Sequence, residues 1–263
     1  MSSAGSREWD ATTYHRVSRP QLEWGTAVLD RLPLEGGETV LDAGCGTGRL
    51  TALLLERLPA GRVIALDRSA AMLRGARELL EPLAPGRVRH LHADLADLPL
   101  RGGLDAVFST ATFHWVTDHP RLFAGIHAAL RPGGRLVAQC GGGPNIRRLH
   151  DRALRLAAAA DYAPHFARWQ DPWEYADAPT TARRLGDAGF AEVRTWLVEA
   201  PVVFEDRAAF VEFTTTVVLR PFLAVLPEAL RGGYAERIAD LAAGDDPPFL
   251  LDYWRLNMDA RRD

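Results

Sequence analysis

The sequence contains no lysine, because all 31 basic residues are arginine. Mechanisms that need a lysine amine are therefore excluded: Schiff-base catalysis, a pyridoxal-phosphate anchor and the phosphate-binding lysine of a P-loop. Cysteine is almost as scarce, with Cys45 and Cys140 alone. Neither has another cysteine or a histidine at metal-ligand spacing, so we expect two buried free thiols and no bound metal.

Long apolar runs are also missing. No segment approaches the roughly 20 uncharged apolar residues of a membrane helix, and the start MSSAGSREWDATTYHR has no signal-peptide core. The 31 basic and 34 acidic residues give a net charge of −3, which provides no general attraction for nucleic acid or an anionic membrane. We therefore expect a cytoplasmic protein whose partner is a small molecule. The sequence leaves its oligomeric state open.

Short apolar segments alternate with amphipathic ones between residues 38 and 140. Strands are predicted at VLDAG, RVIALD, RVRHLHAD, LDAVFST and RLVAQC, and helices between them. This alternation is typical of an α/β fold with a doubly wound, Rossmann-like parallel sheet that helices cover on both faces. Ligands of such sheets bind at the carboxyl ends of the strands.

The chain divides into three predicted segments. Residues 1–37 are expected to form an N-terminal helical lid, and residues 38–140 the ligand-binding core. Residues 141–263 are expected to supply helical cap insertions and the strands that complete the sheet. No internal repeat or long low-complexity linker separates these segments, so we predict one domain with a helical lid.

Gly44, Gly46 and Gly48 follow the first predicted strand in VLDAGCGTGRL. A P-loop would need lysine directly after the last glycine, where Arg49 stands. A dinucleotide fingerprint would place its third glycine one residue after Gly48, which weakens the case for a nicotinamide cofactor and leaves a degenerate version open. Glycines let a backbone approach a flat neutral group closely. The loop therefore predicts a site for a nucleoside cofactor without phosphates.

Three successive strands end in aspartate, at Asp42, Asp67 and Asp94. Asp42 supplies a carboxylate to the pocket. Asp67 can accept hydrogen bonds from both hydroxyls of a ribose, and Asp94 can accept one from an adenine amine. A single aspartate in such a place is more often a helix cap or a turn residue. Together with the glycine loop, the three aspartates indicate a nucleoside site because independent features agree.

The stretches VLDAGCGTGRLT, VIALDRSAAMLRGAR, LHADLADLPL, LDAVFSTATFHWV and ALRPGGRLV resemble, in order and spacing, the motifs of class I S-adenosylmethionine-dependent methyltransferases. The resemblance covers about residues 38–140 and implies a seven-stranded sheet whose last strand, FLLDYWRLNMDA, is antiparallel. It implies S-adenosylmethionine as the cofactor. Asp42 would lie near the cofactor's amino group, Asp67 on its ribose and Met72 against its adenine. The full set of candidate cofactor contacts is Tyr14, Asp42, Gly44, Gly46, Gly48, Asp67, Met72, Asp94, Leu95 and Thr110.

The flanking segments REWDATTYHRVSRPQLEW, FHWVTD and VVLRPFLAVLP are similar to the trans-aconitate methyltransferase group, which methylates small carboxylates. An ionised carboxylate needs no general base, and arginine holds it at two points. The candidate substrate contacts are Trp9, Arg19, Trp115, Trp173 and Arg220. An aromatic cluster is expected either to line an apolar pocket or to form the core of the lid; it comprises Tyr162, Phe166, Trp169, Trp173 and Tyr175.

His114 follows the fourth strand and is expected near the transferred methyl group. It would be either a general base, for a hydroxyl or amine acceptor, or a positioning residue. We predict methylation of a carboxylate or hydroxyl oxygen of a small molecule. Methylation of nitrogen or carbon in a natural-product-like metabolite, a nicotinamide-dependent oxidoreductase and a non-catalytic cofactor-binding regulatory protein stay open as alternatives.

Overall fold

The computed structural model describes residues 19–263, which form two compact units. The sheet unit comprises residues 19–143, 173–198 and 255–263, and the helical unit comprises residues 144–172 and 199–254. Within the described range, none of the helices combines the length and the apolar character that crossing a membrane requires. The predicted segment boundaries at residues 37 and 140 stay predictions.

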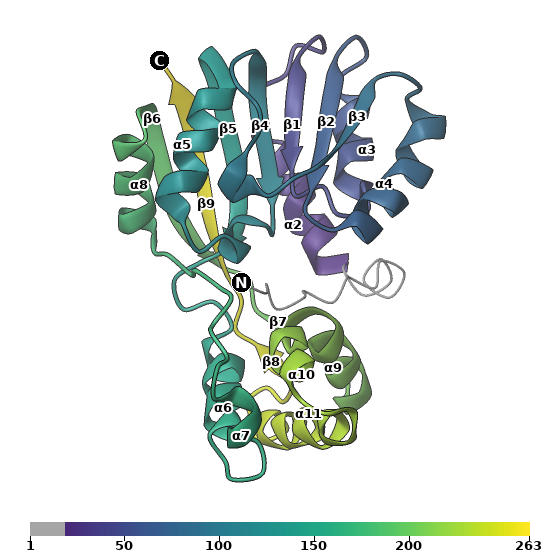
Figure 1. The fold of residues 1–263 in the computed structure, drawn as a ribbon, viewed down its shortest axis with the longest axis vertical. Coiled ribbons are helices and arrows are strands. Elements are labelled where there is room, and N and C mark those ends of the chain that lie inside the picture. Colours follow the sequence, from purple (N-terminus) through teal and green to yellow (C-terminus); the bar gives the residue numbers. More distant parts are fainter. Residues whose placement is uncertain (1–18) are drawn as a thin grey trace. The chain divides into compact units, whose positions relative to one another are not determined.

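A seven-stranded sheet forms the centre of the sheet unit (Figure 1). Its strands are β1 (Thr39–Ala43), β2 (Arg62–Asp67), β3 (Val88–His92), β4 (Leu104–Thr110), β5 (Leu130–Gly141), β6 (Phe190–Glu199) and β9 (Trp254–Arg262). They lie in the order β3-β2-β1-β4-β5-β9-β6. The first five strands pair in parallel, and β9 runs antiparallel to β5. The predicted doubly wound sheet with an antiparallel last strand is confirmed.

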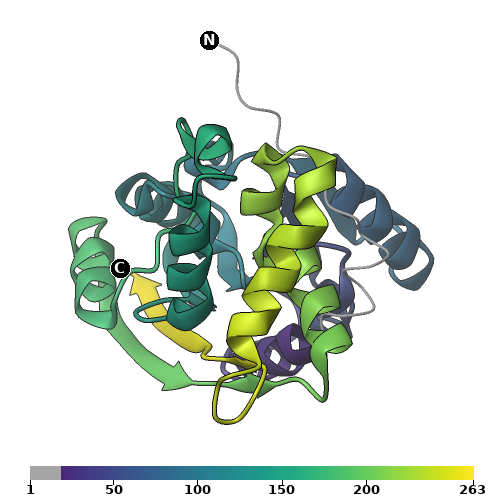
Figure 2. The ribbon, with the colours of Figure 1, turned by 90° about the horizontal axis from the view of Figure 1, so that it is seen from below.

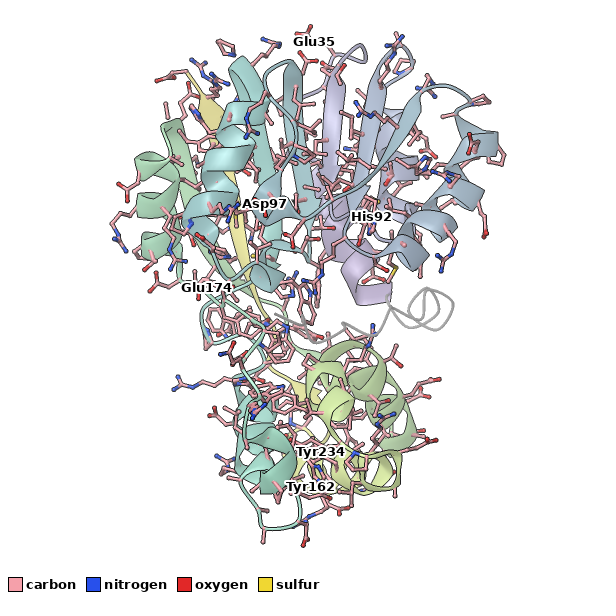
Figure 3. The ribbon with its side chains drawn as sticks, in the orientation of Figure 1. Glu35, His92, Asp97, Tyr162, Glu174 and Tyr234 are labelled. Atoms are coloured by element: carbon pink, nitrogen blue, oxygen red, sulfur yellow. The ribbon has the colours of Figure 1, made fainter. Side chains whose placement is uncertain are left out.

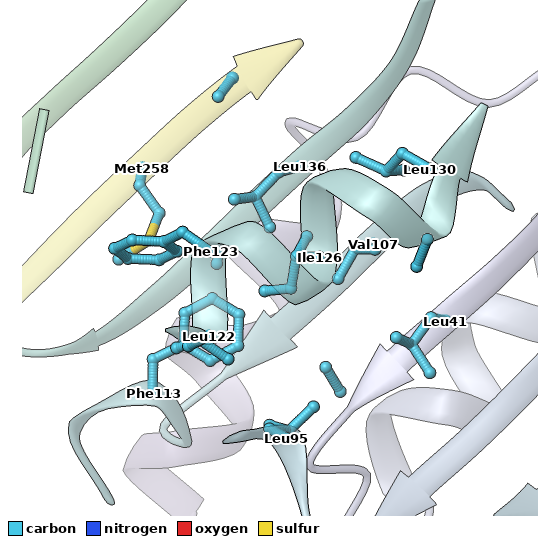
Figure 4. Close-up of a cluster of buried hydrophobic side chains, with 14 of the residues drawn as sticks. Leu41, Leu95, Val107, Phe113, Leu122, Phe123, Ile126, Leu130, Leu136 and Met258 are labelled. Carbon is cyan, nitrogen blue, oxygen red and sulfur yellow. The ribbon is translucent and has the colours of Figure 1, made fainter. Parts of the chain in front are cut away.

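Helices cover both faces of this sheet. They are α2 (Arg19–Leu29), α3 (Arg49–Glu56), α4 (Ala70–Leu83), α5 (His119–Ala129) and α8 (Ala178–Asp187), with the 3-10 helices η1 (Leu95–Asp97) and η2 (Phe113–Trp115). Successive side chains of β1 enter different clusters: Val40 packs with α2, α3 and α4, and Leu41 with α5. Figure 4 shows the cluster that contains Leu41, in which Phe123 and Ile126 of α5 lie over the sheet.

Polar side chains define where the helices near the edge of the sheet begin. Ser69 Oγ accepts a hydrogen bond from the backbone N–H of Met72, and Asp118 caps α5 in the same way through the N–H of Arg121. Each such cap contributes about 1 kcal/mol. The chain therefore turns from strand to helix at fixed points directly beyond β2 and beyond the loop that follows β4.

The helical unit contains α6 (Arg147–Ala157), α7 (Ala163–Phe166), α9 (Arg207–Phe213), a π-helical turn η3 (Thr214–Val218), α10 (Arg220–Val225), α11 (Glu228–Ala242) and the short strands β7 (Val202–Val203) and β8 (Leu250–Leu251). Helices α6 and α11 pack side by side (Figure 2). The buried Tyr234 joins them, because its hydroxyl donates to the carbonyl of Ala153 at 2.6 Å. Its ring and the ring of Tyr162 pack nearly perpendicular, with centres 5.0 Å apart; both residues are labelled in Figure 3.

Candidate functional site

One edge of the sheet unit gathers most of the residues that the sequence singles out. Because β1, β2 and β4 are parallel, their carboxyl ends lie at the same edge. The glycine loop 44–48 follows β1, Asp67 ends β2, and η2 follows β4. The antiparallel β9 brings its first residues to this edge too, where Arg255 pairs with Gly141 of β5.

The glycine loop is open on one side and closed on the other. The N–H groups of Gly44 and Cys45 both donate to the carbonyl of Leu66, at 2.8 and 2.9 Å, which ties the loop to β2. Gly44 has a φ of +87°, and a Cβ there would lie 2.1 Å from Thr112 Oγ1. Gly46 has a φ of +56°, but a Cβ there would meet no atom of residues 19–263 within 4 Å. The loop thus leaves room for a ligand in front of Gly46.

Asp67 connects this loop to the next helix. Its Oδ2 accepts from the N–H of Gly46 at 2.9 Å, and its Oδ1 accepts from the N–H of Ser69 at 2.8 Å. Burial raises the pKa of Asp67, and the two N–H donors act in the opposite direction. Each carboxylate oxygen has a further lone pair, so the group can still accept hydrogen bonds from hydroxyl groups.

Asp42 lies deeper, with 2% of its surface exposed. Its Oδ2 accepts from the hydroxyl of Thr51 on α3 at 2.6 Å. Burial raises the pKa of Asp42 to about 7; the Thr51 bond lowers it, and the charge of Asp67 raises it further. A cation placed nearby would favour the ionised form of Asp42.

The other candidate cofactor contacts border the same edge. Met72 is buried in the first turn of α4, and Leu95 is buried in η1. Asp94 is exposed, and its carboxylate accepts from the N–H of Ala96 at 2.9 Å, which is the role of a helix cap. Thr110 is half-buried, and its carbonyl accepts from the hydroxyl of Thr112. Their contact with a cofactor stays a prediction.

His114 is held as a neutral hydrogen-bond donor. The N–H of Gly141 donates to His114 Nδ1 at 3.3 Å, so Nδ1 carries a lone pair and the neutral ring has its proton on Nε2. Burial lowers the pKa of His114 well below its usual value, and the neighbouring charges of Arg255 and His119 lower it further. At neutral pH the ring can therefore donate through Nε2 and is a poor proton acceptor.

A chain of polar side chains supports η2 from behind. Arg184 Nη1 lies 2.9 Å from Glu174 Oε1 and 3.0 Å from His119 Nδ1. His119 Nε2 in turn lies 3.1 Å from the carbonyl of Phe113. The N–H of Glu174, labelled in Figure 3, donates to the carbonyl of His114 at 2.9 Å. Sequence reasoning missed this network, because its members lie on segments that only the fold brings together.

The predicted aromatic cluster divides between the two units. Trp173 stacks on Tyr175 in the sheet unit, with ring centres 5.9 Å apart, and Trp173 also lies 5.4 Å from Trp115. Tyr175 lies 5.7 Å from His114, so these rings belong to the candidate site. The remaining members pack within the helical unit, against its own aromatic residues; they are Tyr162, Phe166 and Trp169.

Four predicted residues are not placed at this edge by the described structure. Trp9 and Tyr14 lie outside the described residues. Arg19 begins α2, and its side chain also lies outside the described part of the chain. Arg220 begins α10 in the helical unit. Their contacts with substrate or cofactor stay predictions.

Arg255 is a residue of this edge that sequence reasoning missed. Only 4% of its surface is exposed. Its Nε donates to Gln139 Oε1 at 3.4 Å, and its guanidinium lies 4.7 Å from the ring centre of Trp24 on α2. Gln139 is itself held, because its amide donates to Asn257 at 2.8 Å. An arginine inside the apolar stretch YWRLNM was the available signal.

The described residues 19–263 contain no group of three histidine, cysteine or acidic side chains with the geometry of a metal site. Cys45 and Cys140 are both buried free thiols. The arrangement is therefore a bare glycine loop with carboxylates on one side and a neutral histidine with a buried arginine on the other.

Comparison with known proteins gives a consistent family. A family model described as a methyltransferase domain matches residues 40–134. Trans-aconitate 2-methyltransferase of Azoarcus sp. (strain BH72) is 33% identical over 248 residues, which cover 92% of this chain and 90% of that protein. The protein of the same name from Paracidovorax citrulli (strain AAC00-1) is 33% identical over 273 residues, covering 97% and 98%.

Solved structures share the fold. The YcgJ protein of Bacillus subtilis aligns with a TM-score of 0.64 at 13% identity, covering 92% of this chain and 98% of its own. Haemonchus contortus phosphoethanolamine N-methyltransferase 2, in complex with S-adenosyl-L-methionine, aligns with a TM-score of 0.61 at 18% identity, covering 96% of this chain and 56% of its own. At these identities the likeness concerns the fold.

Proposed function

Because the chain belongs to the class I S-adenosylmethionine-dependent methyltransferases, as a relative of the trans-aconitate 2-methyltransferases, we propose that it methylates a carboxylate oxygen of a small organic acid. S-adenosylmethionine supplies an electrophilic methyl group on a positively charged sulfonium. The protein then has to align the acceptor atom with the bond that breaks, and orientation of this kind can supply on the order of 7 to 11 kcal/mol.

The residues of the glycine loop fit such a cofactor. The open space in front of Gly46 admits a ligand against the backbone, and Asp67 retains acceptor capacity for the two ribose hydroxyls. Asp42 would ionise toward the positively charged methionine end. The adenine would lie toward the β2 and β3 side of the loop; the contacts there are Met72, Asp94 and Leu95, with Gly44, Gly48, Thr110 and Tyr14 completing the proposed set.

The state of His114 carries the choice of acceptor. A hydroxyl or amine acceptor has to lose a proton during the reaction, whereas a carboxylate is already ionised at neutral pH. With its proton on Nε2 and its pKa lowered, His114 does not suit the role of general base. It suits that of a donor that orients an anion, which favours a carboxylate over a phenol or an amine.

Aromatic side chains would form the apolar wall of the acceptor pocket. Trp115 lies beside His114 in the sheet unit and Trp173 lies beside Trp115, and an aromatic face near the sulfonium would also attract its positive charge. Trp9, Arg19 and Arg220 belong to the flanks whose pattern is similar to that of the carboxylate-methylating group, and we propose them as further substrate contacts.

The test uses S-adenosylmethionine labelled in its methyl group and a panel of organic acids, phenols and amines. We expect base-labile methyl esters of the acids. Label that enters only phenols or amines would contradict the carboxylate proposal. Calorimetric titration first establishes that S-adenosylmethionine binds, and enhancement of NADH fluorescence would favour the nicotinamide alternative. Cofactor that binds without transfer to any acceptor would favour a regulatory protein.

A further inference from the structure

The order of the strands separates two kinds of charge along the ligand-binding edge. The glycine loop, Asp67 and Asp94 follow β1, β2 and β3, which lie on one side of β4. Arg255 lies on β9, on the other side of β4, and His114 lies in the loop that follows β4 itself. With neighbouring strands about 4.8 Å apart, β9 is about 14 Å from β1. An acceptor placed beyond the methyl group would reach this second side.

Arg255 is fixed in place by groups of the sheet unit. Its Nε bond to Gln139 and its contact with Trp24 define the plane of the guanidinium. Gln139 and Arg31 both donate to Asn257 Oδ1, at 2.8 and 2.9 Å, so the support beneath Arg255 is itself hydrogen-bonded. A guanidinium whose plane is fixed loses little entropy when it binds a planar anion.

Gly141 connects Arg255 to His114. It pairs with Arg255 across the β5–β9 ladder, and its N–H donates to His114 Nδ1. Gly141 is therefore adjacent to both residues, to Arg255 through the pairing of the strands and to the His114 ring through a hydrogen bond. The positive charge of Arg255 also contributes, after burial, to the lowered pKa of His114.

We propose that the Arg255 guanidinium and the Nε2–H of His114 together bind one carboxylate of the methyl acceptor, an inference that rests on the proposed function. A carboxylate that accepts several hydrogen bonds from cationic and neutral donors is a weaker nucleophile than a free one. The carboxylate held here is therefore not the one that receives the methyl group. A second carboxylate of the same acceptor would receive it.

The first experiment measures anion binding without catalysis. Trans-aconitate is titrated into protein saturated with S-adenosylhomocysteine, for the wild type and for Arg255→Gln. Removing one partner of a buried charge pair should weaken trans-aconitate binding about 10²- to 10³-fold. The control Arg62→Gln removes an exposed arginine at the first residue of β2, the opposite edge of the sheet, and should bind like the wild type.

The second experiment compares two acceptors. For Arg255→Gln, kcat/KM for trans-aconitate should fall by the same factor, mainly through KM, whereas kcat/KM for the monocarboxylate crotonate should not change. Binding of S-adenosylmethionine should stay as in the wild type. A variant that loses affinity for S-adenosylmethionine instead would assign Arg255 to the cofactor's own carboxylate and overturn the proposal. Unchanged binding of both ligands would overturn it as well.

Two further variants keep the test decisive. Arg255→Lys retains the charge without the planar fork, so if Arg255→Gln does not fold, the lysine variant should still show about tenfold weaker trans-aconitate binding.

His114→Gln places an amide donor near the position of Nε2 and should keep most of the affinity, whereas the shorter His114→Asn should lose it. A drop in kcat with unchanged KM in both His114 variants would indicate a base and contradict the proposed donor.

A wild-type protein that methylates no organic acid would refute the proposed function and not this inference. The titration with trans-aconitate would then still decide whether Arg255 and His114 form an anion site. Saturating binding that Arg255→Gln abolishes supports the site, and no binding to the wild type refutes it.

Discussion

Gly46→Ala should separate cofactor binding from stability, because the described part of the chain leaves open space where the added methyl would go. A Cβ at Gly46 meets none of the described residues within 4 Å, so the substitution creates no clash with them. The backbone there has a φ of +56°, which costs an alanine roughly 1 to 2 kcal/mol. The reduced entropy of the unfolded chain offsets about 0.4 to 1 kcal/mol of this cost.

The net loss of stability is thus about 1 kcal/mol, which lowers the melting temperature of a chain of this size by about 2 to 4 °C. If the cofactor lies against the loop, the same methyl overlaps it. Overpacking of one methyl group costs about 1 to 3 kcal/mol, so the dissociation constant for S-adenosylmethionine should rise by about fivefold to more than 100-fold. Calorimetric titration measures the affinity, and a thermal melt of the ligand-free protein measures the stability.

Two other glycines make matched controls. Gly86 lies between α4 and β3, at the far edge of the sheet, has a φ of +72° and also faces open space. Gly86→Ala should therefore cost as much stability as Gly46→Ala and leave cofactor affinity unchanged. Gly44→Ala would place a Cβ 2.1 Å from Thr112 Oγ1 and 2.4 Å from its Cγ2, so it should destabilise the protein by about 3 kcal/mol or more. Wild-type affinity in Gly46→Ala would refute the assignment of the loop to the cofactor.

Three other predictions test the electrostatics. Asp42 has a pKa of about 7 and must be ionised to attract the cationic methionine end. The affinity for S-adenosylmethionine should therefore fall about tenfold when the pH is lowered from 8 to 6. In calorimetric titrations, Asp42→Asn should flatten this dependence. Asp245→Ala removes a two-point salt bridge with Arg152, in which the Asp245 side chain is only 8% exposed. The free energy of unfolding measured in urea should fall by about 3 kcal/mol. Asp161→Ala, which removes an exposed surface pair with Arg237, should have little effect. Glu174→Gln should loosen η2 and raise KM for the acceptor without changing cofactor affinity; a melt that stays at the wild-type temperature shows that the effect is local.

Local patterns sufficed to predict the strands that bear the proposed cofactor contacts. The predicted strands RVIALD and LDAVFST are β2 and β4 at the same residues. Each is a short apolar run between clear turn signals, and its termination depends on neighbouring residues alone. The glycine loop and Asp67 follow from the same local rules, because a parallel strand delivers whatever follows it to one edge of the sheet.

The acceptor half depends on pairings that local patterns do not contain. Arg255 reaches the edge only because β9 inserts antiparallel beside β5, in a register that places it opposite Gly141. From the sequence alone, β9 was an antiparallel strand without a register, and a shift of one residue would turn Arg255 to the other face. The aromatic run from Tyr162 to Tyr175 divides for a similar reason, since the chain passes from the helical unit to the sheet unit at residue 173.

The order of the strands separates negative from positive side chains along the edge of the sheet. β4 separates the strands that carry Asp42 and Asp67 from the strand that carries Arg255. A cofactor that presents a positive sulfonium and an acceptor that presents negative carboxylates would each meet the opposite charge on its own side. Interchange of the two ligands would place carboxylates against carboxylates, which is unfavourable. The arrangement proposed to orient the ligands would therefore also discriminate between them, and a neutral His114 between the two sides would repel neither.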